Sequence, residues 1–190
     1  MKIVFASSNQ NKIDEIKQML PADFEIVGLQ DIGFFEEIPE TANTIEGNAI
    51  LKADYITSKF GLNCFADDTG LEIEALHGEP GVYSARYAGE SRSADENMNK
   101  VLQKLAPHAD RRARFKTVIA LNLDGEQFLF NGIINGQIAH EKSGAGGFGY
   151  DPIFIPEHHN QTFAELSSAE KAAVSHRGKA IQQLVAFLKK

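Results

Sequence analysis

The sequence predicts an α/β protein folded as one domain over residues 1–190, and three observations lead to that prediction. Short apolar runs of strand length alternate along the chain with segments whose apolar residues recur at helical spacing. The composition is 43% hydrophobic and contains no low-complexity tract, which is typical of a globular protein. A chain of 190 residues can bury a sizeable core as one domain, with room for two lobes.

The charge balance limits the partners of the chain. It carries 19 basic and 26 acidic residues, for a net charge of -7. Broad binding to nucleic acid or to an anionic membrane needs a basic face, so we expect neither of them to be a partner. A small anionic ligand needs only a few well-placed cations. No apolar run has the roughly 20 residues of a membrane helix or the form of a signal peptide, so we expect a cytoplasmic protein.

The first strand and helix frame a candidate phosphate-binding loop. Residues 2–6 are predicted to form a buried strand, and Ile13, Ile16 and Met19 recur at helical spacing. The polar stretch 7–12 between them would present free N–H groups and the positive end of the helix dipole, where phosphates bind. Helix capping alone is the alternative explanation, although capping needs one polar residue rather than six.

An acidic segment and a helix follow a short strand expected at 24–27. Residues 34–41 include Glu36, Glu37 and Glu40, whose oxygens could ligate a hard divalent cation. An ordinary solvated acidic loop is the alternative. The next segment, 44–59, is predicted to be a helix, and Lys52 lies beside its apolar face. Lys52 could reach a ligand or extend to solvent.

Two adjacent carboxylates, Asp67 and Asp68, form the centre of the predicted site. The apolar run 63–66 is typical of a buried strand, and we expect that strand to stop at the two aspartates. Adjacent strand side chains point to opposite faces, so one aspartate could hydrogen-bond the scaffold while the other faces a ligand. The alternative is a solvated Asp-Asp-Thr-Gly turn.

The middle of the chain is predicted to be a long irregular segment, a helix and a hairpin. The Ser93 and Glu96 spacing is that of a capping box, and Asp124-Gly125 is a hairpin turn signal. A bend or bulge is expected near Gly132 and Gly136. The ranges expected are an irregular segment at 77–89, a helix opened at 93, and strands at 112–123, 127–134 and 137–139.

The glycine-rich run 144–149 has the spacing of a dinucleotide-binding motif, but that motif must open a helix. Here a strand is expected at 150–155 instead. The run could let backbone approach a ligand beside the ring of Phe148, or it could only satisfy positive φ angles.

A capping box at Ser167 and Glu170 opens another helix. Lys171, His176 and Arg177 cannot share one face of a straight helix, because offsets of five and six residues rotate them roughly 140° and 240°. If all three meet one ligand, the helix must break near residues 175–178, and Gly178 permits that break. A final packed helix follows.

These segments together resemble the inosine/xanthosine triphosphate pyrophosphatase family, almost from end to end. Thr69 and Ser8 stand where many members have Ser and Gly, and Gly47 stands where many have Glu. The matching motifs are Ser7-Ser8-Asn9 with Lys12, Glu40-Thr41, 47–53, 66–71, 80–87, 146–152 and 175–178.

The resemblance implies an elongated, two-lobed α/β fold with a central mixed, twisted sheet and a groove between the lobes. It implies a homodimeric hydrolase acting on acid anhydrides, with Mg²⁺ as cofactor. Such an enzyme cleaves dITP, ITP and XTP or dXTP to the monophosphate and pyrophosphate, clearing them from the nucleotide pool. Two alternatives are a pyrophosphatase for modified pyrimidine nucleotides and a nucleotide-binding module without catalysis.

The same resemblance implies the residue roles. Asp68 would be the catalytic base and a Mg²⁺ ligand, and Glu40 or Glu37 would complete the metal site. His176, Arg177 and residues 148–151 would form the base pocket. The substrate-binding residues it implies are Ser7, Ser8, Asn9, Gln10, Asn11, Lys12, Lys52, Thr69, Phe148, Gly149, Tyr150, Asp151, Lys171, His176 and Arg177.

Overall fold

The computed structural model describes residues 2–21 and 24–189, and the chain divides into two compact units. Unit 1 comprises Met1–Asp68, Thr117–Gly132 and Arg177–Lys190. Unit 2 comprises Thr69–Lys116 and Ile133–His176. Each unit is therefore assembled from segments that are distant in the sequence.

Seven strands of the described residues form one mixed sheet, which confirms the predicted α/β class. The order is β2-β1-β3-β5-β6-β7, with β4 paired to β3. β1 is parallel to both β2 and β3, whereas β3 with β4 and β6 with β7 are antiparallel. The strands are β1 Lys2–Phe5, β2 Glu25–Val27, β3 Cys64–Ile73, β4 Pro80–Gly81, β5 Arg112–Leu123, β6 Glu126–Ile138 and β7 Phe154–Pro156.

The α-helices agree closely with the sequence periodicity, and side chains cap four of them. Asn9, Thr44, Ser93 and Ser167 each accept a hydrogen bond from a backbone N–H of the first turn, which satisfies a donor that the helix itself leaves open. The helices are α1 Gln10–Met19, α2 Ile45–Phe60, α3 Ala94–Leu105, α4 Ser168–Val174 and α5 His176–Leu188. Short 3₁₀ turns are η1 Gln30–Ile32, η2 Glu74–Leu76, η3 Ser84–Arg86 and η4 Asp151–Ile153.

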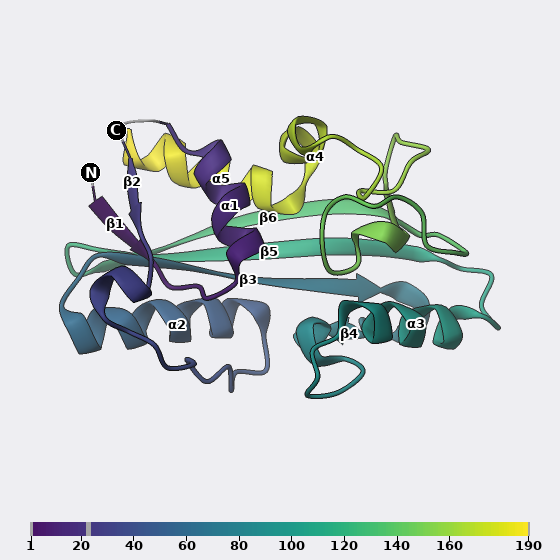
Figure 1. Ribbon diagram of the computed structural model, residues 1–190, viewed down its shortest axis with the longest axis horizontal. Helices are drawn as coiled ribbons and strands as arrows, with labels where there is room; N and C mark the ends of the chain where they lie inside the picture. The colour runs from purple at the N-terminus through teal and green to yellow at the C-terminus, as the bar shows by residue number, and fades with distance from the viewer. Residues whose placement is uncertain (1, 22–23, 190) are drawn as a thin grey trace. The chain divides into compact units, whose positions relative to one another are not determined.

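Unit 1 is a three-layer arrangement, with α2 on one face of the strands and α1 and α5 on the other (Figure 1). The layers follow from strand alternation, because successive side chains point to opposite faces. Val4 and Ala66 pack with α2, whereas Phe5 and Phe65 pack with α1 and α5. The Phe5 and Phe65 rings stack with centroids 4.7 Å apart.

Unit 2 has its own core. Met98, Val101 and Leu105 form the buried stripe of α3, as the helical spacing predicted. They pack in one cluster with Leu71, Ile73 and the aromatic side chains of β5 and β7. No helix among residues 2–21 and 24–189 is both long and apolar enough to cross a membrane.

The predicted division of the second hairpin strand into 127–134 and 137–139 is wrong. β6 continues through Gly132 and Gly136 as one strand and pairs with β7. A Cβ at Gly136 would lie 2.3 Å from the Ile155 carbonyl oxygen and 2.8 Å from the Phe154 ring. The glycine is therefore explained by close strand packing rather than by a bend.

The predicted break before the last helix is present, although Gly178 does not make it. α4 ends at Val174, and α5 begins at His176. Ser175 between them is extended, with φ -69° and ψ 156°, and Gly178 lies inside α5. A single extended residue is enough to redirect the chain, so the lack of a side chain at Gly178 is not needed.

Candidate functional site

The predicted phosphate-binding loop is shorter than the sequence indicated. Lys12 lies in the first turn of α1, as expected, but α1 begins at Gln10, so Gln10 and Asn11 also belong to that turn and only Ser7, Ser8 and Asn9 remain in the loop. The Asn9 side chain accepts a hydrogen bond from the Lys12 backbone N–H at 3.3 Å. Asn9 therefore caps α1 at the positive end of the helix dipole. This arrangement is compatible with helix capping alone and with phosphate binding.

The two aspartates lie in the middle of a strand, not at its end. β3 runs from Cys64 through Asp67 and Asp68 to Ile73, so the expected stop after Ala66 is wrong. The strand tolerates both carboxylates because cationic side chains reach each of them. The predicted alternation holds, since Asp67 contacts α1 and α5 and Asp68 contacts α2.

Asp67 is enclosed by cations within unit 1. Its side chain is fully buried, with the Lys12 ammonium 3.0 Å from Oδ1 and the Arg177 Nε 3.3 Å from Oδ2. Glu15 of α1 pairs with the Arg177 guanidinium as well. Burial alone would raise the pKa of Asp67, but Lys12 and Arg177 outweigh that effect and hold the pKa well below its usual range. Asp67 is therefore a charged link between α1 and α5 at neutral pH.

Asp68 has the opposite surroundings. Burial raises its pKa, and the attraction of Lys52 only partly opposes this. Lys52 Nζ lies 3.6 Å from Asp68 Oδ1 and donates a 2.6 Å hydrogen bond to Glu40 Oε1. Asp68 Oδ2 is buried and has no hydrogen-bond partner among the described residues. A carboxylate in this state can accept a proton or bind a cation that the protein does not supply.

The carboxylate oxygens near Lys52 are candidate ligands for Mg²⁺. Glu40 and Asp68 both approach the Lys52 ammonium, so their oxygens converge on a position suited to a cation. No group of three or more His, Cys, Asp or Glu side chains in the described part of the chain forms a complete protein cage. Mg²⁺ is usually held by one or two carboxylates together with substrate phosphates, so Glu40 and Asp68 fit this ion. The role at the metal that was expected for Glu37 stays a prediction.

A second charged cluster lies in unit 2, at the glycine-rich loop. Lys171 Nζ donates a 2.6 Å hydrogen bond to Asp151 Oδ2, and the Phe148 backbone N–H donates to the same oxygen at 2.8 Å. The Lys171 ammonium lies 4.7 Å from the Phe148 ring centroid. A Cβ at Gly147 would lie 2.1 Å from Asp151 Oδ2, and its φ is 69°. Gly147 therefore lets the loop close around the Asp151 carboxylate.

His176 is held in the aromatic core of unit 2. Its ring stacks on Phe115, with centroids 4.6 Å apart and planes 17° apart, and tilts toward Phe163 at 6.2 Å. Only 3% of the residue is exposed. These aromatic contacts fix the orientation of the imidazole ring.

The remaining predicted site residues fall in the same two units. Ser7 and Lys12 are half-buried, whereas Ser8, Asn9, Gln10 and Asn11 are exposed in unit 1. Thr69 and Gly149 are half-buried in unit 2. Tyr150 is buried and donates a 2.7 Å hydrogen bond from its hydroxyl to the Ser84 carbonyl. The structure thus brings Lys12, Lys52, Asp68, Glu40 and Arg177 together in unit 1, and Phe148, Asp151 and Lys171 in unit 2.

Sequence reasoning missed three residues that support these clusters. Glu15 pairs with Arg177, and its place one turn after Lys12 on α1 was the available signal. Asn97 on α3 accepts from the Ala88 N–H at 2.6 Å and donates to the Ala85 carbonyl at 3.1 Å. Ser84 accepts from the Leu71 N–H at 2.9 Å. Asn97 and Ser84 together fix the irregular segment 80–88.

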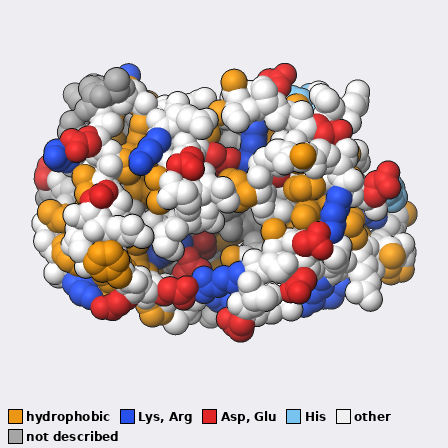
Figure 2. All heavy atoms as spheres, viewed as in Figure 1, with side chains coloured by type: hydrophobic (Ala, Val, Ile, Leu, Met, Phe, Trp, Pro, Cys, Tyr) orange, Lys and Arg blue, Asp and Glu red, His pale blue; other side chains and the backbone are white. Residues whose placement is uncertain are grey.

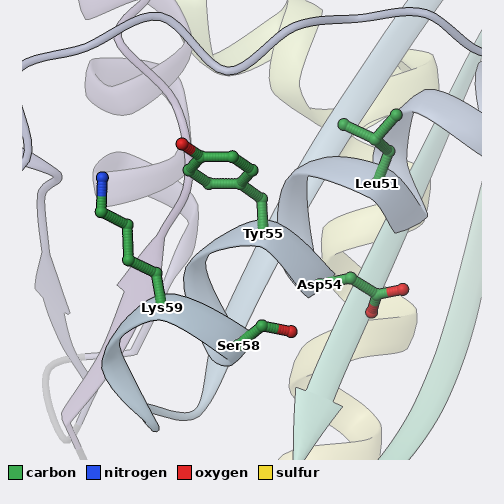
Figure 3. A pocket seen from close by; sticks show the side chains of 5 residues that line it. All are labelled: Leu51, Asp54, Tyr55, Ser58 and Lys59. Atoms are coloured by element: carbon green, nitrogen blue, oxygen red, sulfur yellow. The ribbon is translucent and has the colours of Figure 1, made fainter.

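The surface can be compared with these clusters on the face seen in Figure 2 and at a depression along α2. On the face seen in Figure 2, basic side chains are interspersed with acidic ones rather than gathered into a basic field. Figure 3 shows a shallow depression along α2, lined by Leu51, Asp54, Tyr55, Ser58 and Lys59. None of these five is a predicted site residue. The buried charged clusters are therefore the stronger candidate for function.

The structure is thus a mixed α/β fold in which buried carboxylates are paired with lysines. The chain belongs to the Ham1 family, whose model matches residues 3–187.

Relatives and solved structures agree over the full length. The chain is 62% identical over 188 residues to a dITP/XTP pyrophosphatase of Flavobacterium johnsoniae, covering 99% of this chain and 98% of that protein. It is 53% identical over 189 residues to a dITP/XTP pyrophosphatase of Porphyromonas gingivalis, covering 98% and 97%. The Ham1 protein of Staphylococcus aureus has a TM-score of 0.90 at 46% identity, and that of Coxiella burnetii 0.92 at 40%. Both structural matches cover 100% of this chain and 98% of the other.

Proposed function

We propose that the protein hydrolyses deaminated purine nucleoside triphosphates, dITP, ITP and XTP, to the monophosphate and pyrophosphate. Relatives that are 53–62% identical over almost the whole chain are named dITP/XTP pyrophosphatases. The observation that carries the proposal is the state of Asp68, a buried carboxylate with one oxygen lacking a hydrogen-bond partner within the described chain. Such a group needs either a proton or a cation, and the proposed reaction supplies both.

The reaction is a hydrolysis at the α-phosphorus. A water molecule attacks that phosphorus, and the bond to the oxygen bridging the α- and β-phosphates breaks, so that oxygen leaves with pyrophosphate. The attacking water loses a proton to the Asp68 carboxylate, whose Oδ2 has no hydrogen-bond partner within the described residues. Asp67 cannot take this role, because its pKa is held low and its oxygens already accept from Lys12 and Arg177.

The phosphate charge must be neutralised before a nucleophile can approach. Lys12 and the N-terminal N–H groups of α1 supply positive potential, and Lys52 supplies another charge beside Asp68. Mg²⁺, when bound by Asp68 and Glu40 together with phosphate oxygens, would polarise the phosphoryl group. We propose that the activity depends on Mg²⁺, because Asp68 and Glu40 supply the oxygen donors that this ion prefers.

Discrimination would come from donors fixed before the substrate arrives. Hypoxanthine and xanthine carry an acceptor oxygen at C6, whereas adenine carries an amino donor. The Arg177 guanidinium is held by Asp67 and Glu15, so its N–H groups have a fixed direction. A donor directed at the C6 oxygen would lose its partner if adenine were bound, and an unpaired buried polar group costs about 1–3 kcal/mol.

The test is pyrophosphate release from a nucleotide panel with Mg²⁺ present. We expect the highest kcat/KM values for ITP, dITP and XTP, and low values for dUTP and the four normal dNTPs. Absence of pyrophosphate release from ITP would overturn the enzymatic proposal, and preference for dUTP would overturn the purine assignment. Chelation by EDTA is expected to abolish turnover, with recovery on adding Mg²⁺. We also propose a homodimer, which light scattering of the purified protein tests.

A further inference from the structure

Lys52 lies where a metal ion would be expected. Its ammonium is 2.6 Å from Glu40 Oε1 and 3.6 Å from Asp68 Oδ1, the two carboxylates proposed to hold Mg²⁺. The Lys52 and Asp68 side chains are 9% and 11% exposed, and that of Glu40 is 31% exposed. The lysine therefore provides a positive charge at the position where these carboxylates converge.

The surroundings of Lys52 differ from those of a stable structural ion pair. The neighbouring Asp67 has two cationic partners that contact both of its oxygens. Asp68, by contrast, has the Lys52 ammonium at 3.6 Å, beyond hydrogen-bond distance, and its second oxygen has no partner within the described residues. A single ammonium offsets one of the two negative charges and leaves this donor set incompletely satisfied.

An ammonium and a divalent cation cannot occupy one pair of carboxylates together. The positive charge of Lys52 repels a free metal ion and competes for Glu40 and Asp68. A triphosphate changes this competition, because its oxygens offer the ammonium another partner and offer the metal additional ligands. The arrangement thus favours binding of the metal together with the phosphate over binding of the metal alone.

We propose that Lys52 is the resident counter-cation of the metal site, in addition to its expected contact with the triphosphate. Without nucleotide its ammonium offsets part of the negative charge of Glu40 and Asp68 and weakens the binding of a free divalent ion. When the triphosphate binds, the ammonium of Lys52 moves to a phosphate oxygen. Both carboxylates then become available to the metal. The inference rests on the proposed metal-assisted hydrolysis, and it makes Lys52 a positioning residue that couples metal binding to substrate binding.

The experiment is a titration of the full chain with Mn²⁺ in the absence of nucleotide, followed by electron paramagnetic resonance. Lys52→Met removes the charge and keeps most of the side-chain length, so we expect at least tenfold tighter Mn²⁺ binding than in the unsubstituted protein. Lys52→Arg keeps the charge, so its Mn²⁺ affinity should remain weak. Lys59→Met is the matched control, because Lys59 lies on the same helix and pairs with exposed Glu36 at 3.5 Å.

Folding of each variant is checked by circular dichroism before the titration. Equal Mn²⁺ affinity in Lys52→Met and the unsubstituted protein, including no detectable binding in either, would overturn the inference. A gain in Lys52→Arg or Lys59→Met as large as that in Lys52→Met would also overturn it, because charge would not be the cause. Failure of the proposed function is separate and would appear as no pyrophosphate release from ITP by the unsubstituted protein.

Discussion

Adjacent residues of β3 face two regions of unit 1 with opposite electrostatics. On the side of α1 and α5, Asp67 is fully buried between Lys12 and Arg177, and its pKa is lowered. On the side of α2, Asp68 has Lys52 at 3.6 Å, its pKa is raised, and one of its oxygens has no partner in the described chain. A carboxylate whose bonds are satisfied stabilises structure, whereas one left incompletely satisfied is available for chemistry.

The largest effect is expected from Asp68→Asn. The amide cannot accept the proton of the attacking water, and general base catalysis contributes about 10²–10⁴-fold. We expect kcat for pyrophosphate release from ITP to fall by about that factor, while circular dichroism shows an unchanged fold. Turnover close to that of the unsubstituted protein would remove Asp68 from the role of base.

Asp67→Asn should instead act mainly on stability. Removing one partner of a buried ion pair costs about 3–5 kcal/mol, because Lys12 and Arg177 would remain buried without a compensating charge. Urea unfolding at pH 7 measures this loss. Asp110→Asn is the control, because Asp110 pairs with exposed Arg112 on the surface and should change stability by less than about 1 kcal/mol. Equal effects in the two variants would contradict the comparison.

The pH dependence of the Asp67→Asn effect has a definite sign. The pKa of Asp67 is lower in the folded state than its ordinary value of about 3.9, so its stabilisation is present above that value. The stabilisation is lost as pH falls toward the folded-state pKa. The stability difference between the unsubstituted protein and Asp67→Asn should therefore be nearly constant from pH 7 to about pH 5 and should shrink as the pH falls below about 3.9.

Arg177→Ala tests whether the Asp67 region also serves specificity. Loss of the fixed guanidinium is expected to lower the ratio of kcat/KM for ITP to that for ATP by about tenfold, which corresponds to about 1.4 kcal/mol of differential binding. Lys17→Ala is a suitable control, since Lys17 is an exposed residue in the last turn of α1. An unchanged ratio would exclude Arg177 from base recognition.

The smallest effect concerns Cys64, which lies on the α2 side of β3. The thiol is fully buried, and burial raises its pKa to about 12. Labelling by a disulfide reagent at pH 8 should therefore be very slow in the folded protein and fast in urea. Rapid labelling of the folded protein would show that this side of the strand opens to solvent.

The helices and most strands could be predicted because their signals are local. The capping residues Ser93 and Ser167 place the starts of α3 and α4, and the apolar stripe Ile45, Ala49, Ala53 and Ile56 places α2, each within one or two residues. The end of β3 could not be predicted in this way. Two adjacent aspartates normally indicate a turn, and the cations that keep them within a strand come from residues 12, 52 and 177.

The α/β class, the positions of the helices and the charged residues of the candidate site could be read from local patterns in the chain. Periodicity and capping depend on neighbours a few residues away, so the chain states them directly. The tertiary structure was needed to show which aspartate has partners on both oxygens and which has an oxygen available for a further ligand. That choice depends on cations brought from distant segments and on burial, and both change the free energy of a carboxylate without leaving a local pattern.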